Sequence, residues 1–183
     1  NGRLEKEEKY YTFDGRTALY VALKSLNLPP ESNIGVPLYC CESVFDTILE
    51  MGFSITFVDV NIDDFCIDLK SLNEVKDDLS AIIVIHMFGK TADIQSVRTI
   101  MGDTYIIEDC AHSVFGFYQN VNSNRRNITG TEGDLSFYSF RIGKYITSGS
   151  GGMIVVNNPH LSNSVKYNVS RLLSQNNYKI LQD

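Results

Sequence analysis

The segment AIIVIHMF, residues 81–88, constrains the fold more than any other stretch, because His86 is its only polar residue. An apolar run without alternation is typical of a strand that is buried on both faces of a parallel sheet. Such a sheet needs helices on both of its faces, so helices must connect the strands. The segment therefore predicts an α/β fold with a mostly parallel sheet, in which His86 is a core histidine with satisfied hydrogen bonds.

Helical and strand patterns alternate along the rest of the chain, as this fold requires. Strands are predicted at 33–37, 54–60, 81–88, 105–110, 133–140 and 153–158. Helices are predicted at 16–28, 41–52, 68–77 and 92–102, and residues from 163 onward are predicted to begin another. Asp14 and Asp68 precede two of these helices as N-terminal caps. The polar stretch 119–133 is predicted to be a loop.

Composition and charge exclude several classes of protein. The chain has 183 residues, 43% of them hydrophobic, which is enough for one sizeable core. A net charge of −6 argues against nucleic acid or an anionic membrane as the main partner. No apolar run reaches transmembrane length, and the first residues lack the apolar region of a signal peptide. The four cysteines lack zinc-site spacing, so we expect reduced thiols in a cytoplasmic protein without a metal site.

Lys144 lies between two strand-like runs in SFYSFRIGKYITSGSGGMIVV, residues 136–156, just before several glycines. Glycines at this density indicate positive φ or close backbone approach, and such loops often carry reactive groups. Neither a P-loop, a GxGxxG turn nor a GxSxG elbow fits the chain. A lysine together with Asp109 at the end of the strand YIIED is the minimum for pyridoxal phosphate chemistry, but spacing alone leaves it one option among several.

Six segments, taken in order, resemble the DegT/DnrJ/EryC1/StrS family of pyridoxal-phosphate-dependent sugar aminotransferases. They are GRTALYVAL, VPLYCCESVFDTILEMGFSITFVDV, IIVIHMFGKTADI, IIEDCAHSVFG, GDLSFYSFRIGK and GSGGMIVVNN. The resemblance implies the three-layer α/β/α large domain of a fold-type-I transferase. It also implies that residues 1–183 form this one domain and that the C-terminal small domain is missing or truncated.

The resemblance implies catalytic and phosphate-binding roles. Lys144 matches the Schiff-base lysine, and Asp109 matches the aspartate that faces the pyridine nitrogen of the cofactor. Ser139 matches the serine that binds the cofactor phosphate. The family's turn at the same phosphate corresponds to Gly15, Arg16 and Thr17.

Contacts to the cofactor ring are implied for two further residues. His112 stands where the family has Gln or His near the ring hydroxyl. The stacking aromatic residue of the family falls on Cys41, and Tyr39, two positions earlier, is the expected substitute. Ser150 replaces a glutamate in the family's GEGG turn.

The implied reaction moves an amino group from a donor such as glutamate to a keto sugar that is carried on a nucleotide. The implied assembly is a homodimer with its active site near the subunit boundary. Two alternatives stay open. One is a pyridoxal-dependent sugar dehydratase, although histidine replaces the lysine in those relatives. The other is a catalytically inactive or regulatory fragment that keeps the cofactor fold.

Overall fold

The structure is a computed structural model that describes residues 8–114, 116–119 and 126–174. Its centre is a seven-stranded sheet with the strand order β1-β9-β8-β5-β4-β2-β3. The strands are β1 (Glu8–Thr12), β2 (Asn33–Pro37), β3 (Ser54–Val58), β4 (Ala81–Ile85), β5 (Tyr105–Asp109), β8 (Leu135–Ser139) and β9 (Gly152–Val156). β9 pairs antiparallel with β1 and β8, whereas the other pairs are parallel. The predicted α/β fold with a mostly parallel sheet is confirmed.

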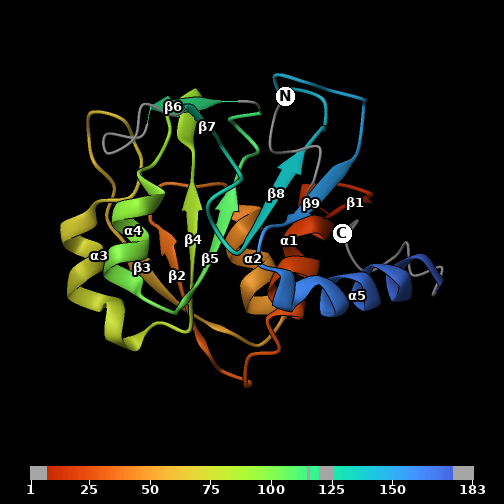
Figure 1. Ribbon diagram of the computed structural model, residues 1–183, viewed down its shortest axis with the longest axis horizontal. Coiled ribbons are helices and arrows are strands. Elements are labelled where there is room, and N and C mark those ends of the chain that lie inside the picture. Colours follow the sequence, from red (N-terminus) through yellow and green to blue (C-terminus); the bar gives the residue numbers. More distant parts are fainter. Residues whose placement is uncertain (1–7, 115, 120–125, 175–183) are drawn as a thin grey trace.

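Helices cover both faces of this sheet (Figure 1). They are α1 (Gly15–Ser25), α2 (Glu42–Glu50), α3 (Leu69–Val75), α4 (Ile94–Met101) and α5 (Ser162–Ser174), with short 3-10 turns η2 (Lys76–Asp78), η3 (Met87–Gly89) and η4 (Pro159–Leu161). The apolar side chains of α1, α2 and α5 pack in one core cluster, and those of α3 and α4 pack in a second. The molecule therefore has three layers.

Local sequence explains why these elements begin and end where they do. All five residues of β4 are buried, as the apolar run 81–88 predicts. The side chains of Asp14 and Asp68 accept hydrogen bonds from the Thr17 and Ser71 amides and so cap α1 and α3. Gly52, just beyond the end of α2, has a φ of 78°, which favours glycine. Local capping and burial therefore determine where these elements begin and end.

Two features differ from the sequence-based prediction. β1 carries no strand prediction, yet it forms an edge of the sheet by pairing with β9, a partner far away in sequence. The polar stretch 119–133 is not entirely a loop, because β6 (Phe117–Gln119) and β7 (Arg126–Ile128) form a two-stranded antiparallel ladder. Residues 120–125 of this stretch lie outside the described residues. Both pairings depend on partner strands rather than on an apolar pattern of their own.

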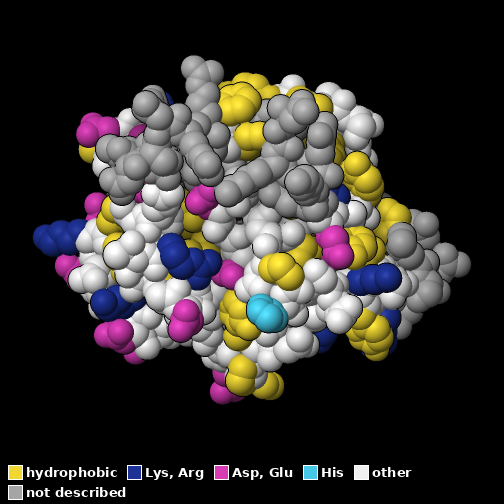
Figure 2. Space-filling view, viewed as in Figure 1, with side chains coloured by type: hydrophobic (Ala, Val, Ile, Leu, Met, Phe, Trp, Pro, Cys, Tyr) yellow, Lys and Arg dark blue, Asp and Glu magenta, His cyan; other side chains and the backbone are white. Residues whose placement is uncertain are grey.

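The surface carries no large region of a single charge on the face that Figure 2 shows, where acidic and basic side chains are interspersed among the described residues. This distribution fits the modest net charge of −6. Among the described helices, none combines the length and the apolar character that crossing a membrane requires.

Candidate functional site

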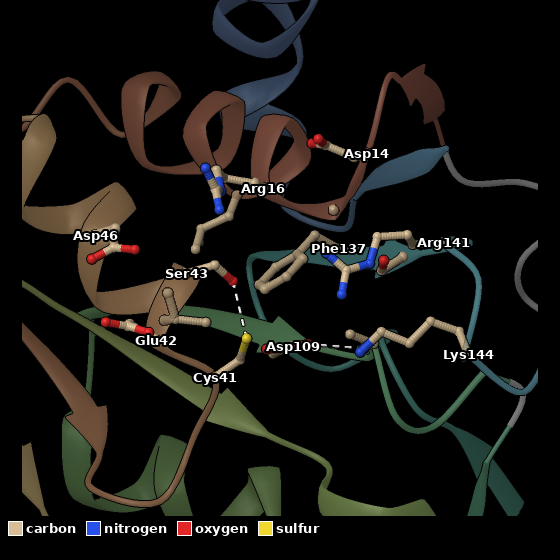
Figure 3. A pocket seen from close by; sticks show the side chains of 15 residues that line it. Asp14, Arg16, Cys41, Glu42, Ser43, Asp46, Asp109, Phe137, Arg141 and Lys144 are labelled. Atoms are coloured by element: carbon tan, nitrogen blue, oxygen red, sulfur yellow. Dashed lines mark hydrogen bonds between the residues drawn. The ribbon is translucent and has the colours of Figure 1, made fainter. Parts of the chain in front are cut away.

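A cavity of about 550 Å³ opens at the carboxyl edge of the sheet, between the first turns of α1 and α2 and the ends of β5 and β8 (Figure 3). This edge is where open α/β sheets build their sites. The cavity is lined by five of the eight residues that the sequence nominates: Gly15, Arg16, Asp109, Ser139 and Lys144. The other three, Thr17, Tyr39 and His112, are not among its lining residues.

The N-terminus of α1 forms one wall of the cavity. Asp14 caps the helix, and its Oδ1 accepts the Thr17 amide at 2.7 Å, so that this amide is not available to a ligand. The amides of Gly15 and Arg16 belong to the first helical turn, where no backbone carbonyl lies within the helix to accept them. A Cβ on Gly15 would lie 2.8 Å from the Ser139 Cβ, and glycine therefore allows α1 to approach β8 closely. Thr17 is buried beneath this surface.

Asp109 ends β5 at the floor of the cavity and is 6% exposed. Its Oδ1 accepts the Ala111 amide at 2.8 Å. Burial raises the pKa of Asp109 to about 6, against the opposing effects of the Ala111 amide and of the positive charge of Lys144. The Lys144 side chain extends toward Asp109 (Figure 3). A buried carboxylate therefore faces an amine across the cavity.

The loop that carries Lys144 depends on its glycines. Gly143, Gly149 and Gly151 have φ values of 93°, 86° and 128°, a region that side chains with a Cβ rarely adopt. A Cβ on Gly152 would overlap the Asp14 carbonyl, because β9 passes directly beneath the start of α1. The glycines that follow Lys144 therefore serve both a tight turn and a close backbone approach.

His86 and Glu108 form a fully buried pair behind the cavity floor, with Nε2 and Oε2 2.8 Å apart. The His86 Nδ1 accepts the Ala92 amide, so the Nε2 carries the proton and donates to Glu108. The Glu108 carboxylate also accepts three backbone amides, those of Gly130, Glu132 and Gly133. The prediction of a satisfied core histidine is confirmed.

Cys110 lies close enough to this pair for the three side chains to surround an ion. Both ring nitrogens of His86 and both carboxylate oxygens of Glu108 already have hydrogen-bond partners. Burial raises the pKa of the Cys110 thiol well above its usual value, which disfavours the thiolate that binds metals. The three side chains are therefore a structural cluster. Burial by itself raises the pKa of Glu108, but the contact with His86 and the Gly133 and Glu132 amides lower it below its usual value.

Replacing Glu108 with alanine is expected to destabilise the protein by about 3–5 kcal/mol, because His86 and three backbone amides lose their acceptor. Urea unfolding followed by circular dichroism measures this effect. Glu74→Ala, an exposed change on α3, is the control and should shift stability by less than about 0.5 kcal/mol. Equal unfolding midpoints for the two variants would show that the cluster does not hold the loop at residues 130–133.

Tyr39 and His112 belong to an aromatic cluster beside the cavity. Tyr39 lies 5.2 Å from Phe65 and 6.2 Å from Phe88 between ring centroids, and Phe88 lies 5.8 Å from His112. Burial, followed by the charge of Lys144, lowers the pKa of His112. Cys41, rather than Tyr39, lines the cavity, and its Sγ lies 3.2 Å from the Ser43 Oγ.

The lining residues to which the sequence assigns no role include Phe137, Arg141 and Asp46. The first two could have been found, because Phe137 and Arg141 flank Ser139 at a spacing of two and so share its face of the strand. Asp46 lies on α2, and nothing in its sequence neighbourhood distinguishes it from a solvated helix face.

Comparison with known families identifies this arrangement. The model of the DegT/DnrJ/EryC1/StrS aminotransferase family matches residues 9–177. The chain belongs to this family. The family resemblance predicted from the six sequence segments is thereby confirmed.

Curated DegT/DnrJ/EryC1/StrS relatives include GDP-perosamine synthase of Vibrio cholerae, which is 30% identical over 147 residues. That alignment covers 79% of this chain and 38% of the Vibrio protein. A putative L-glutamine:3-amino-2,3-dideoxy-scyllo-inosose aminotransferase of Micromonospora echinospora is 29% identical over 145 residues, which are 78% of this chain and 33% of that protein. The chain thus spans less than half the length of these relatives.

Solved structures of similar fold come from enzymes with different reactions. The structure of 3-amino-5-hydroxybenzoic acid synthase superposes with a TM-score of 0.78 at 24% identity, covering 89% of this chain and 41% of that one. A GDP-4-keto-6-deoxymannose-3-dehydratase variant with bound GDP-perosamine superposes with a TM-score of 0.75 at 25% identity, covering 84% and 40%. These likenesses support the fold of a DegT/DnrJ/EryC1/StrS large domain, and they include both a synthase and a dehydratase.

Proposed function

We propose that this chain is the cofactor-binding large domain of a pyridoxal-phosphate-dependent aminotransferase. It would move an amino group from a donor such as glutamate to a nucleotide-linked keto sugar. One observation carries the proposal: a single cavity holds the Lys144 amine opposite the buried carboxylate of Asp109, with Ser139 and the start of α1 on its wall. Family membership supports the same chemistry.

The residues that line the cavity fit both ends of pyridoxal phosphate, its phosphate group and its ring nitrogen. Ser139 is 8% exposed, and its hydroxyl has no hydrogen bond to any described residue, so it is free to bind a phosphate oxygen. The amides at the start of α1 add donors and a favourable helix dipole. Asp109, with a pKa of about 6, is mostly ionised at neutral pH and can hold a proton on a ring nitrogen. When bound, the cofactor supplies an electron sink for the carbon that loses its proton.

The protein's own groups then have distinct tasks. The Lys144 Nζ would hold the cofactor by condensing with its aldehyde with loss of water, and once the donor's amine has displaced it, the Nζ would move a proton to and from the substrate carbon. Asp109 would keep the ring nitrogen protonated through its negative charge. His112 and Tyr39 are proposed to lie beside the ring, at the edge of the cavity where the aromatic cluster begins.

The substrate class follows from relatives and is proposed on that basis. The Vibrio relative is named for GDP-perosamine, and a dehydratase with bound GDP-perosamine shares the fold. Dehydratases of this family carry histidine at the position of the catalytic lysine, as the sequence resemblance implies. Lys144 at this position therefore favours transamination over dehydration.

We also propose that the active form is a homodimer located in the cytoplasm. Exposed apolar side chains surround Lys144 on its loop: Ile142 is 76% exposed, Tyr145 77% and Ile146 45%. Apolar groups gathered beside a site are typical of surfaces that another chain covers. All four cysteines are free, which is the usual state in a reducing compartment.

Incubation of the protein with pyridoxal phosphate and glutamate, followed by addition of a nucleotide-linked keto sugar, tests the function. We expect absorbance near the edge of the visible range on cofactor binding, then release of one equivalent of 2-oxoglutarate per bound cofactor. Absence of cofactor binding would contradict the whole proposal. Cofactor binding without 2-oxoglutarate would favour the inactive-fragment alternative, and formation of a deoxygenated sugar would favour the dehydratase.

A further inference from the structure

We propose that Arg141 is a phosphate-binding residue that supplies a positive charge to the cofactor's phosphate ester. The inference rests on the proposed function, because it assigns a further residue to the same cavity. Neither the sequence motifs nor the family resemblance gives Arg141 a role.

The first observation is the position of Arg141 on the strand. Phe137, Ser139 and Arg141 all line the cavity, and their spacing of two places them on one face of β8 and its extension. Arg141 remains in a strand-like position after β8 ends, because it forms a parallel bridge with Gly149. Two residues of extended chain span about 7 Å, which is within the reach of an arginine side chain. Arg141 is therefore the next residue after Ser139 on this face of the strand, and Ser139 is the serine that is proposed to bind the phosphate.

The second observation is the direction and partnership of the guanidinium. In Figure 3 the Arg141 side chain projects into the cavity on the side of Lys144. Within the described part of the chain, the Arg141 guanidinium makes no hydrogen bond or ion pair. Arg16, the other arginine on the lining, is drawn on the side of the cavity that α2 forms, where Glu42 and Asp46 lie. Arg141 is thus the arginine that lies on the same side of the cavity as Lys144.

The third consideration is charge. A phosphate monoester carries between one and two negative charges at neutral pH. Ser139 and the amides of Gly15 and Arg16 are neutral donors, so they satisfy the oxygens without balancing this charge. An arginine fork matches phosphate geometry and forms charge-assisted hydrogen bonds. Arg141 supplies the missing cation from within the chain.

The decisive experiment compares two aldehydes, pyridoxal phosphate and pyridoxal, which differ only in the phosphate. Their dissociation constants are measured by fluorescence and absorbance titration for wild-type protein, Arg141→Gln, Arg141→Lys and Lys70→Gln. Lys70 is an exposed cation on α3 and controls for the loss of one charge. We expect Arg141→Gln to weaken pyridoxal phosphate binding about 10- to 100-fold and to leave pyridoxal binding unchanged. Arg141→Lys should recover part of the loss, and Lys70→Gln should match wild type.

Each other outcome overturns the inference. Equal weakening of both aldehydes would mean that Arg141 acts on the ring or on the fold, and no weakening would mean that it does not touch the cofactor. Unchanged cofactor binding with weaker binding of glutamate would assign Arg141 to the donor's carboxylate instead. Failure of wild-type protein to bind either aldehyde would overturn the proposed function as well, whereas a normal wild type with an unaltered variant overturns this inference alone.

Discussion

Replacing Lys144 with alanine is expected to abolish covalent attachment of pyridoxal phosphate and to slow transamination at least about 10³-fold. The side chain extends across a cavity rather than into the core, so the fold should survive its loss. Borohydride reduction followed by mass spectrometry of the intact protein measures the attachment. After treatment with cofactor and reductant, the variant should differ in mass from untreated wild type by the substitution alone, with no cofactor added.

Lys90→Ala is the control for this experiment, because Lys90 is an exposed lysine outside the cavity lining. It should gain the mass of the reduced cofactor as the wild type does. If Lys144→Ala still acquired one equivalent of trapped cofactor, the assignment of the reactive amine to Lys144 would be wrong, and peptide mapping would identify the lysine that carries it.

Asp109→Asn is expected to bind pyridoxal phosphate but to slow the half-reaction with glutamate by roughly 10²–10⁴-fold. The amide has the size of the carboxyl group but no charge, so it cannot hold a proton on the ring nitrogen. Single-turnover absorbance measurements separate this loss of rate from a loss of cofactor. A rate within a factor of a few of wild type would remove Asp109 from the mechanism.

The same variant has a readout that is independent of activity. Folding raises the pKa of Asp109 from 3.8 to about 6, so the folded state holds this proton more tightly than the unfolded state. The stability that this contributes is fully present below the unfolded pKa and is lost as pH rises through about 6. Without cofactor, the unfolding free energy of wild type relative to Asp109→Asn should therefore fall between about pH 4 and pH 6. A constant difference across this range would mean that Asp109 is not buried as described.

Much of the fold follows from local sequence. The apolar run 81–88 identifies a parallel sheet, and Asp14 and Asp68 mark helix starts because their side chains satisfy amides within three residues. Family membership can also be recognised from the sequence, because the matching segments keep their order along the chain. These features depend on neighbouring residues, which is why the sequence reveals them.

Features that depend on residues far away in the sequence cannot be predicted from local sequence in the same way. β1 becomes a strand through its pairing with β9, and the direction of Arg141 depends on the bridge to Gly149. Tyr39 was expected over the cofactor ring, yet its nearest aromatic partners, Phe65 and Phe88, come from other loops. Its role at the ring, like those of the other nominated site residues, stays a prediction.

The position of Gly152 has a consequence for the order in which parts of the domain fold. It pairs with Thr12 on one side and with Ser139 on the other, and the Ser150 hydroxyl donates to the Phe13 carbonyl at 2.9 Å. The start of α1 is therefore held against β8 by a strand that is synthesised more than a hundred residues later. Contacts of such long sequence separation form late, because the intervening chain must first be ordered. In a nascent chain that has not yet added β9, α1 and β8 are not held together, so binding of the cofactor at the proposed phosphate site would report that the sheet has formed.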